Sequence, residues 1–230
     1  MTTARDLAAL ASLLADETRS ALCLALLDGR AWTAGELASH VGVARSTTTE
    51  HLHRLVGGGL LTERRQGRHR YVELADASVA DLLEDLSSRV EPRPPSSSGL
   101  TAVTADAALR RARTCYDHLA GTLGVAVTDA MVRKGLLHAE GGLTVTPAGT
   151  NWFTKALGSP LHPTRRPLTR DCLDWTERRP HVAGTVGATL CTTFLRNNWL
   201  VRAGKTRAVR PTPEGRTALA DLLDLDVSRM

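Results

Sequence analysis

The chain has 230 residues, of which 42% are hydrophobic and 23% are charged, an ordinary composition for one large or two modest folded units. This composition excludes a collagen, a wholly disordered chain and a disulfide-stapled miniprotein. No run approaches the roughly 18 apolar residues that a membrane span needs, and the charged N-terminus lacks the apolar segment of a signal peptide. We therefore expect a cytoplasmic protein with no membrane partner.

The net charge of +5 is unevenly divided along the chain. Residues 1–90 carry ten Arg and twelve acidic residues, whereas residues 91–230 carry 19 Lys or Arg and twelve acidic residues. The total charge permits a nucleic-acid partner, but only the positions of the arginines can locate one. The four cysteines form no Cys-x-x-Cys pair, so we expect reduced thiols and no disulfide framework.

A Pro- and Ser-rich stretch, EPRPPSSSG at residues 91–99, interrupts the apolar periodicity. Such a stretch cannot pack into a core, and proline stiffens it. We therefore predict three segments: an N-terminal unit over residues 1–90, a linker over 91–100 and a C-terminal unit over 101–230.

Helix signals follow one another through the first 60 residues. A leucine stripe over residues 7–14 predicts a first helix. Asp16 is placed to cap a second helix that ends at Gly29. Thr33 and Glu36 have the spacing of a capping box for a short third helix. A fourth helix is predicted from Arg45 to the three glycines at 57–59.

A hairpin and one more helix complete the N-terminal unit. The segment LLTERRQGRHRYVEL predicts two short strands around a turn at Gly67. Apolar residues between 79 and 90 then recur with helical spacing.

The C-terminal unit contains an internal sequence repeat. Twelve residues separate Gly124 from Leu136, and twelve again separate Gly187 from Trp199. Each segment then passes a glycine-containing hairpin into Thr-Pro-x-Gly, at residues 146–149 and 212–215. Thr suits the N-cap of a helix and Pro suits its first turn. We therefore predict two copies of helix, hairpin and helix.

Three segments, LADETRSALCLALLDG, ELASHVGVARSTTTEHLHRL and GGLLTERRQGRHRYVEL, together resemble the ArsR-type repressors over roughly residues 7–90. The resemblance implies a winged helix-turn-helix that binds a pseudo-palindromic operator in double-stranded DNA as a homodimer. The fold class expected is mainly α with small β-hairpin wings (α+β). The C-terminal unit is expected to hold two winged-helix-like helix–hairpin–helix repeats.

The DNA-reading face is predicted on the fourth helix and on the hairpin, which would form the wing. Leu52, Leu55 and Val56 are expected on the buried side of the helix, whose N-terminal end would enter the major groove. The residues predicted to contact DNA from this helix are Arg45, Ser46, Thr47, Thr49, Glu50, His51 and Arg54. The wing adds Arg64, Arg65, Arg68, His69 and Arg70, which suit phosphates or a narrow minor groove. The alternative is a solvated polar helix beside a charged hairpin tip.

The apolar stripes at 7–14 and 79–90 exceed what one small unit needs to bury, which supports the homodimer. The alternative is that the C-terminal unit covers them within the same chain.

ArsR-type metal sensors use a Cys pair in the helix before the turn, or Asp, His and Glu ligands on the last helix. Here the first position reads ELASHVG without Cys, and the last helix reads DASVADLLEDLSSRV without His. Thiolate and imidazole ligands give zinc-type metals their affinity. We therefore predict no metal site and no cofactor, and an unidentified small-molecule effector.

The segment DCLDWTERRPHVAG, residues 171–184, is the candidate effector site. Trp175 offers an apolar wall, and Arg178, Arg179 and His181 have the chemistry to hold an anion; the alternative is a core Trp with ordinary helix ion pairs. Cys172 near these arginines, together with Cys191, is a candidate thiol sensor. The alternative there is a pair of buried, inert cysteines.

Catalysis is not expected. The chain has no Walker pattern, HExxH or GxSxG, and Cys115 and His118 are a pair of a kind that chance often supplies. We predict no catalytic residue. The remaining rival is a winged-helix module for protein contacts without specific DNA binding, against which the arginine-rich hairpin argues.

Overall fold

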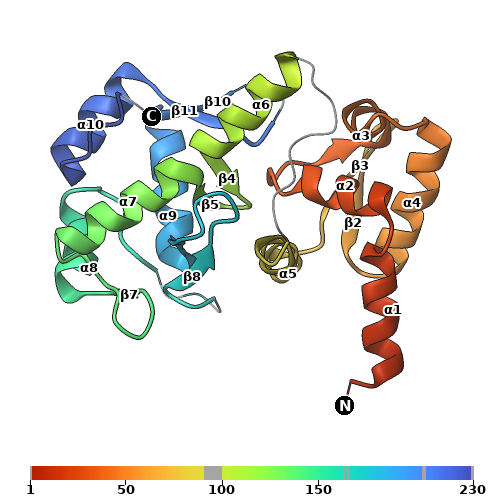
Figure 1. The fold of residues 1–230 in the computed structure, drawn as a ribbon, viewed down its shortest axis with the longest axis horizontal. Helices are drawn as coiled ribbons and strands as arrows, with labels where there is room; N and C mark the ends of the chain where they lie inside the picture. The colour runs from red at the N-terminus through yellow and green to blue at the C-terminus, as the bar shows by residue number, and fades with distance from the viewer. Residues whose placement is uncertain (1, 91–99, 163, 165, 204–205, 229–230) are drawn as a thin grey trace. The chain divides into compact units, whose positions relative to one another are not determined.

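The computed structural model describes residues 2–90, 100–162, 164, 166–203 and 206–228. It divides into two compact units, residues 1–83 and 84–230 (Figure 1). Residues 91–99 of the predicted linker lie outside the described residues. No helix formed by the described residues has the length and apolar character that crossing a membrane requires.

The second and third helices of the N-terminal unit begin at the residues that the sequence predicts, and the first begins three residues before its predicted leucine stripe. Thr3 and Asp6 form a capping box at the start of α1 (Ala4–Leu14), and the Asp16 side chain accepts the Arg19 N–H at the start of α2 (Glu17–Leu26). Thr33 and Glu36 form the predicted capping box of α3 (Ala34–Val41), which ends at Gly42 in the left-handed conformation. Local hydrogen bonds of this kind fix helix ends.

The helix-turn-helix is completed by α4 (Arg45–Gly57), and the wing by β2 (Leu61–Gln66) and β3 (His69–Leu74). Gly67 turns the hairpin with a φ of 58°, as predicted. A third strand, β1 (Trp32–Thr33), was not predicted; it pairs with β3, so the sheet order is β1-β3-β2. Helix α5 (Ala77–Ser88) follows the sheet. Leu22, Leu37 and Leu55, all fully buried, lie in the core beneath these helices.

The C-terminal unit alternates helices with two-stranded antiparallel hairpins. Its elements in chain order are α6 (Leu100–Arg111), β4 (Arg113–Cys115), β5 (His118–Ala120), α7 (Gly121–Arg133), β6 (Leu137–His138), β7 (Thr144–Val145), α8 (Pro147–Lys155), β8 (Arg170–Leu173), β9 (Pro180–Ala183), α9 (Gly184–Arg196), β10 (Leu200–Arg202), β11 (Val209–Pro211) and α10 (Pro213–Leu223). The sequence predicted neither α6 nor the hairpins β4–β5 and β8–β9. In Figure 1, α7 and α9 lie at the middle of this unit, and both are mostly buried.

Both Thr-Pro-x-Gly segments start helices, as predicted. Thr146 and Thr212 accept the backbone N–H of Gly149 and Gly215 through their side chains, with Pro in the first turn. Glycine is needed because a Cβ at Gly215 would overlap the Trp199 carbonyl oxygen. Each tetrapeptide therefore caps its helix and lets the preceding segment pass close to it.

Candidate nucleic-acid interface

The N-terminal end of α4 is open to a ligand. Ala44 occupies the N-cap and supplies no side-chain hydrogen bond, so the N-cap side chain leaves the first-turn N–H groups of α4 available. Arg45, Ser46 and Thr47 are exposed there, while Thr48 and the leucines farther along face inward. A helix end of this kind favours a phosphate group and is the end that meets base edges in the major groove.

Arg45 lies against the other helix of the helix-turn-helix. A Cβ built on Gly35 of α3 would stand 3.3 Å from Arg45 Nη2, so a larger residue there would press on the guanidinium. Among the described residues the Arg45 side chain has no ion pair, which leaves its donors available for a phosphate or a guanine.

Glu50 and Arg54 both face outward, as predicted, but they face each other. Arg54 Nη2 donates to Glu50 Oε1 at 2.6 Å, with the two side chains 58% and 64% exposed. An exposed pair at this spacing adds only about 0.3–0.5 kcal/mol to stability. Its main effect is electrostatic, because the pair presents a neutral patch on the outward face of α4.

The prediction that His51 faces outward is wrong. Its side chain is only 15% exposed, and its Nδ1 lies 3.5 Å from Arg19 Nη1 and 3.9 Å from Asp16 Oδ1. Position 51 adjoins the inward positions 48, 52 and 55 on the helix, so the ring packs toward the start of α2. The hydrogen bond from the Arg19 N–H lowers the pKa of Asp16 against the opposing effect of desolvation, and the charges of Arg19 and His51 add to the lowering.

The wing presents three arginines that are free to meet DNA. Arg64, Arg65 and Arg68 are exposed, and none has an ion pair within the part of the chain that the structure describes. Arg70 differs, because its Nε donates to Glu63 Oε2 at 2.6 Å and its Nη1 lies 2.9 Å from His53 Nε2. Arg70 therefore connects the wing to α4, and His53, on the exposed face of α4, is a residue that the sequence analysis missed.

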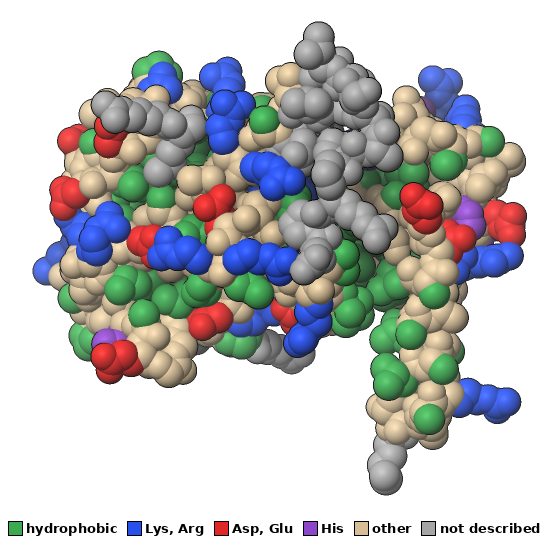
Figure 2. Space-filling model, viewed as in Figure 1, with side chains coloured by type: hydrophobic (Ala, Val, Ile, Leu, Met, Phe, Trp, Pro, Cys, Tyr) green, Lys and Arg blue, Asp and Glu red, His purple; other side chains and the backbone are tan. Residues whose placement is uncertain are grey.

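Strand register spreads the basic groups over both faces of the wing. Arg65 stands opposite Arg70, whereas Arg64 stands opposite Tyr71 on the other face. Figure 2 shows blue side chains projecting from the N-terminal unit at the edge where Figure 1 draws α3 and α4. Arginines on both faces suit a hairpin that follows a phosphate backbone.

The four candidate effector residues have separate partners. The Trp175 ring lies under the Arg113 guanidinium, 4.6 Å from its Cζ. Arg178 donates to the Ser88 carbonyl at 3.0 Å, and Arg179 pairs with Asp129 at 2.8 Å. His181 is buried, with 1% exposure. The side chains predicted to hold one anion together are thus engaged in different contacts.

His181 and Cys172 lie beside Cys115 and His118 inside the C-terminal unit. One ligand atom from each of the four lies within 4.8 Å of the others, so these are the described residues that could hold a metal. A hydrogen bond from Cys115 lowers the pKa of Cys172 against the effect of burial, with His118 and His181 assisting, while burial raises the pKa of Cys115. The arginines invoked for Cys172 in the sequence are not among these causes.

Cys191, the second candidate thiol sensor, packs in the main core of the unit. Burial raises the pKa of its thiol to about 12, which disfavours a reactive thiolate.

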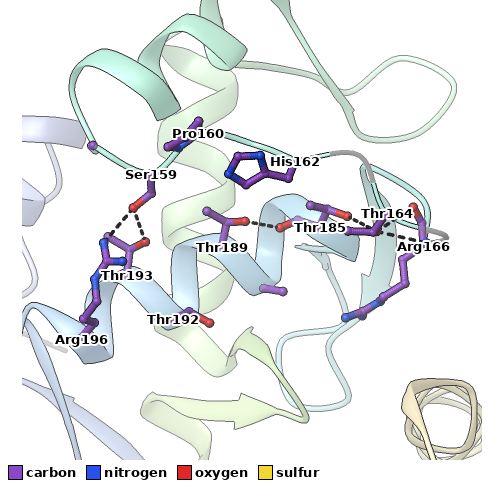
Figure 3. Close-up of a pocket in the computed structure, with 12 residues that line it drawn as sticks. Ser159, Pro160, His162, Thr164, Arg166, Thr185, Thr189, Thr192, Thr193 and Arg196 are labelled. Carbon is purple, nitrogen blue, oxygen red and sulfur yellow. Dashed lines mark hydrogen bonds between the residues drawn. The ribbon is translucent and has the colours of Figure 1, made fainter.

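A polar hollow of about 430 Å³ lies between α9 and the segment after α8 (Figure 3). Threonines of α9 line it, with Arg196 and Arg166 toward its two ends. Most of these groups bond one another: Thr193 and Arg196 both donate to Ser159, at 2.9 and 3.0 Å. Because these polar groups already hydrogen-bond one another, they are not arranged as a cluster of charged groups that await a ligand.

The helix-turn-helix, its open N-terminal end and the cationic wing define a winged helix-turn-helix regulator that binds DNA. A family described as "Helix-turn-helix domain" matches residues 14–64. The chain is 38% identical over 226 residues to the HTH-type transcriptional regulator YdfF of Bacillus subtilis, covering 96% of this chain and 99% of that protein. It is also 42% identical over 80 residues to the HTH-type transcriptional regulator CmtR of Mycobacterium tuberculosis, covering 35% and 67%.

This chain belongs to the ArsR-type family of helix-turn-helix transcriptional regulators. The similarity to YdfF extends along the C-terminal unit as well. Solved structures that resemble part of the chain include the cadmium sensor CmtR of Mycobacterium tuberculosis, with TM-score 0.34, 37% identity, and coverage of 41% of this chain and 96% of that one. The repressor BigR of Xylella fastidiosa gives TM-score 0.36, 26% identity, and coverage of 39% and 91%.

Proposed function

We propose that the protein is a homodimeric repressor that binds a pseudo-palindromic operator and is released by a small-molecule effector. In this proposal the start of α4 reads the major groove, and the wing holds phosphates or the adjacent minor groove. The observation that carries it is a set of four exposed arginines without ion pairs among the described residues. These are Arg45, Arg64, Arg65 and Arg68.

The lack of an ion pair at these arginines affects the free energy of DNA binding. An arginine already paired with a carboxylate must exchange that partner for a phosphate, whereas an unpaired one gives up only water and releases counterions from the DNA. Arg54 and Arg70 already have partners and contribute less to DNA binding in this proposal. Arg54 remains paired with Glu50, and Arg70 positions the wing through its contact with His53.

The dimer is supported by α1. No residue of this helix is buried, and Leu7 on its apolar stripe is 63% exposed. Covering a leucine fully is worth about 1.5–3 kcal/mol, so burial of Leu7 and of the exposed parts of the half-buried Leu10, Leu13 and Leu14 supports association with a second copy. A twofold pair of α4 helices would then match two half-sites about one helical turn apart.

The C-terminal unit is assigned to dimerisation, effector sensing or both. Its segments α7-β6-β7-α8 and α9-β10-β11-α10 have the same order of elements, which supports the proposed repeat. An effector acts in this scheme by changing the spacing of the two α4 helices. A few kcal/mol of differential affinity between the two states suffices for release.

The test is a fluorescence-anisotropy titration of the full chain against DNA from upstream of its own gene and a shuffled control, at two salt concentrations. The proposal requires tight, salt-dependent preference for the upstream DNA that Arg45→Ala reduces. Weak, salt-insensitive binding to both DNAs would instead favour a protein-interaction module. A dilute monomer by light scattering would overturn the dimer.

A further inference from the structure

One sequence pattern occurs twice in the C-terminal unit, just before α7 and just before α9. It reads Arg-x-Cys-x-Asp, then His-x-Ala-Gly-Thr-x-Gly, over residues 113–124 and 170–187. The second copy differs by six residues inserted between the Asp and the His. Two copies with this many shared positions point to one structural requirement met twice.

Each copy forms a hairpin that sets its Cys opposite its His. Cys115 pairs with His118 across β4 and β5, and Cys172 pairs with His181 across β8 and β9. Residues directly opposite in an antiparallel pair project from the same face. Since β5 also contacts β9, the two faces bring all four side chains together.

The distances suit a single tetrahedral ion. The two Sγ atoms are 3.7 Å apart, too far for a disulfide. Two thiolates bound to one zinc ion at about 2.3 Å in tetrahedral geometry stand about 3.8 Å apart. The His118 and His181 ring centroids are 5.1 Å apart, and each of the four residues is 1% exposed.

Three of the four imidazole nitrogens lack a hydrogen-bond partner among the described residues. His118 Nε2 and both ring nitrogens of His181 are buried without a hydrogen bond among the described residues. Burying such groups unsatisfied is costly, and coordination of a metal ion is one of the standard ways in which a protein satisfies them. A metal ion would use one lone pair from each ring and remove most of this penalty.

A carboxylate lies close to Nδ1 of each of the two histidines. His118 Nδ1 lies 3.4 Å from Asp117 Oδ1, and His181 Nδ1 lies 3.3 Å from Asp174 Oδ2. Asp117 is itself held by Arg166, and Asp174 by Arg113 at 3.0 Å. A carboxylate beside Nδ1 favours Nε2 as the metal ligand, which is the usual outer arrangement of a zinc-bound His. Asp117 is in hydrogen-bond contact with His118, and Asp174 lies at ion-pair distance from His181.

We propose that Cys115, His118, Cys172 and His181 bind one zinc ion that joins the two hairpins. Two thiolates balance the charge of Zn²⁺ in the interior, and sulfur and imidazole donors select zinc over magnesium or calcium. Four protein ligands close the coordination sphere, so the ion is structural. The site is distinct from the two family positions, in α3 and α5, on which the expectation of no metal rested.

The first experiment measures zinc in the full-length protein purified under reducing conditions without chelator. We expect about one zinc per chain in the wild type and in Cys23→Ser and Cys191→Ser, which remove buried thiols outside the cluster. Cys115→Ser and Cys172→Ser lower the zinc content to background. Asp117→Asn retains the ligands and weakens zinc affinity about 10–100-fold in a chelator competition.

Cobalt provides a readout that does not depend on whether a cysteine variant folds. Co²⁺ added to wild-type protein stripped of metal should give the intense visible bands of a tetrahedral site and a thiolate charge-transfer band. Zinc added afterwards should abolish both. The proposal is overturned if reduced wild type holds no zinc and gives no such bands, if a Cys115–Cys172 disulfide is present under reducing conditions, or if the Cys115→Ser/Cys172→Ser double variant keeps its zinc. None of these results depends on DNA binding.

Discussion

Arg68→Ala tests how the wing uses its charge. Arg68 follows Gly67 at the turn of the wing, is exposed, and has no ion pair within the described part of the chain. The substitution removes one phosphate contact per chain and two per dimer. Each such contact adds about 0.9 to the steepness of log affinity against log salt, so the slope should become shallower by about 1.8 for the dimer.

The change is large enough to measure. Between about 50 and 200 mM salt, a slope change of about 1.8 alters the loss of affinity by about tenfold. Anisotropy titrations of operator and random DNA across that range give the slope directly. Because a phosphate contact carries no sequence information, both DNAs should lose affinity to the same extent.

Arg179→Ala is the matched control. It removes the same formal charge from a side chain that is also exposed, but which pairs with Asp129 in the C-terminal unit. An equal change in slope for both variants would refute the reasoning, since the effect would then belong to net charge and not to the wing. An unchanged slope for Arg68→Ala would remove this residue from the interface.

Further substitutions separate the other roles. Arg45→Ala should lower the preference for operator over random DNA by about 1–3 kcal/mol, measured by competition titration. His51→Ala should instead reduce stability in urea by about 1 kcal/mol and leave that preference intact, because the ring packs on α2. Leu7→Glu should convert the dimer to a monomer by light scattering; a retained dimer would exclude α1 from the interface. Arg113→Ala strands the buried carboxylate of Asp174 and should destabilise the chain by about 3–5 kcal/mol in urea unfolding.

Local signals account for what the sequence predicted of the fold. Asp16, Thr33 with Glu36, and Thr146 each make hydrogen bonds within three residues, so their sequence neighbourhood specifies the helix start. Strand β1 gave no such signal, because Trp32 and Thr33 become a strand only by pairing with Val72 and Tyr71 of β3. A two-residue strand is defined by its distant partner.

In the candidate interface, too, some features could be predicted from local sequence patterns and others depend on distant contacts. Exposure of Arg45 follows from helical periodicity, and the exposure of the wing arginines follows from their position around the turn at Gly67; a sequence shows both directly. The pairing of Arg70 with Glu63 and His53 depends on how the hairpin folds back onto α4, which periodicity does not contain. His51 was misplaced because one position on a helix separates an inward side chain from an outward one.

The Cys/His cluster was not predicted from the sequence because its two halves lie far apart along the chain. Cys115 and His118 alone are an unremarkable pair, and their partners come 57 residues later in the case of Cys172. Aligning the two copies from their helices onward omits the hairpins that carry the ligands. Starting the comparison at Arg113 and Arg170, which lie 11 residues before Gly124 and 17 residues before Gly187, would have revealed the repeated Arg-x-Cys-x-Asp pattern.

The separation of 57 residues between Cys115 and Cys172 has a topological consequence. Helix α7, the hairpin β6–β7 and helix α8 all lie between these cysteines, so a bridge at this point encloses one whole helix–hairpin–helix segment in a ring. By the loop-closure relation, a cross-link spanning this many residues lowers the entropy of the unfolded chain by an amount worth about 4 kcal/mol. While the proposed zinc ion stays bound, a protease cut between His118 and Cys172 would leave the two fragments joined through the ion, whereas a cut beyond His181 would leave no such link.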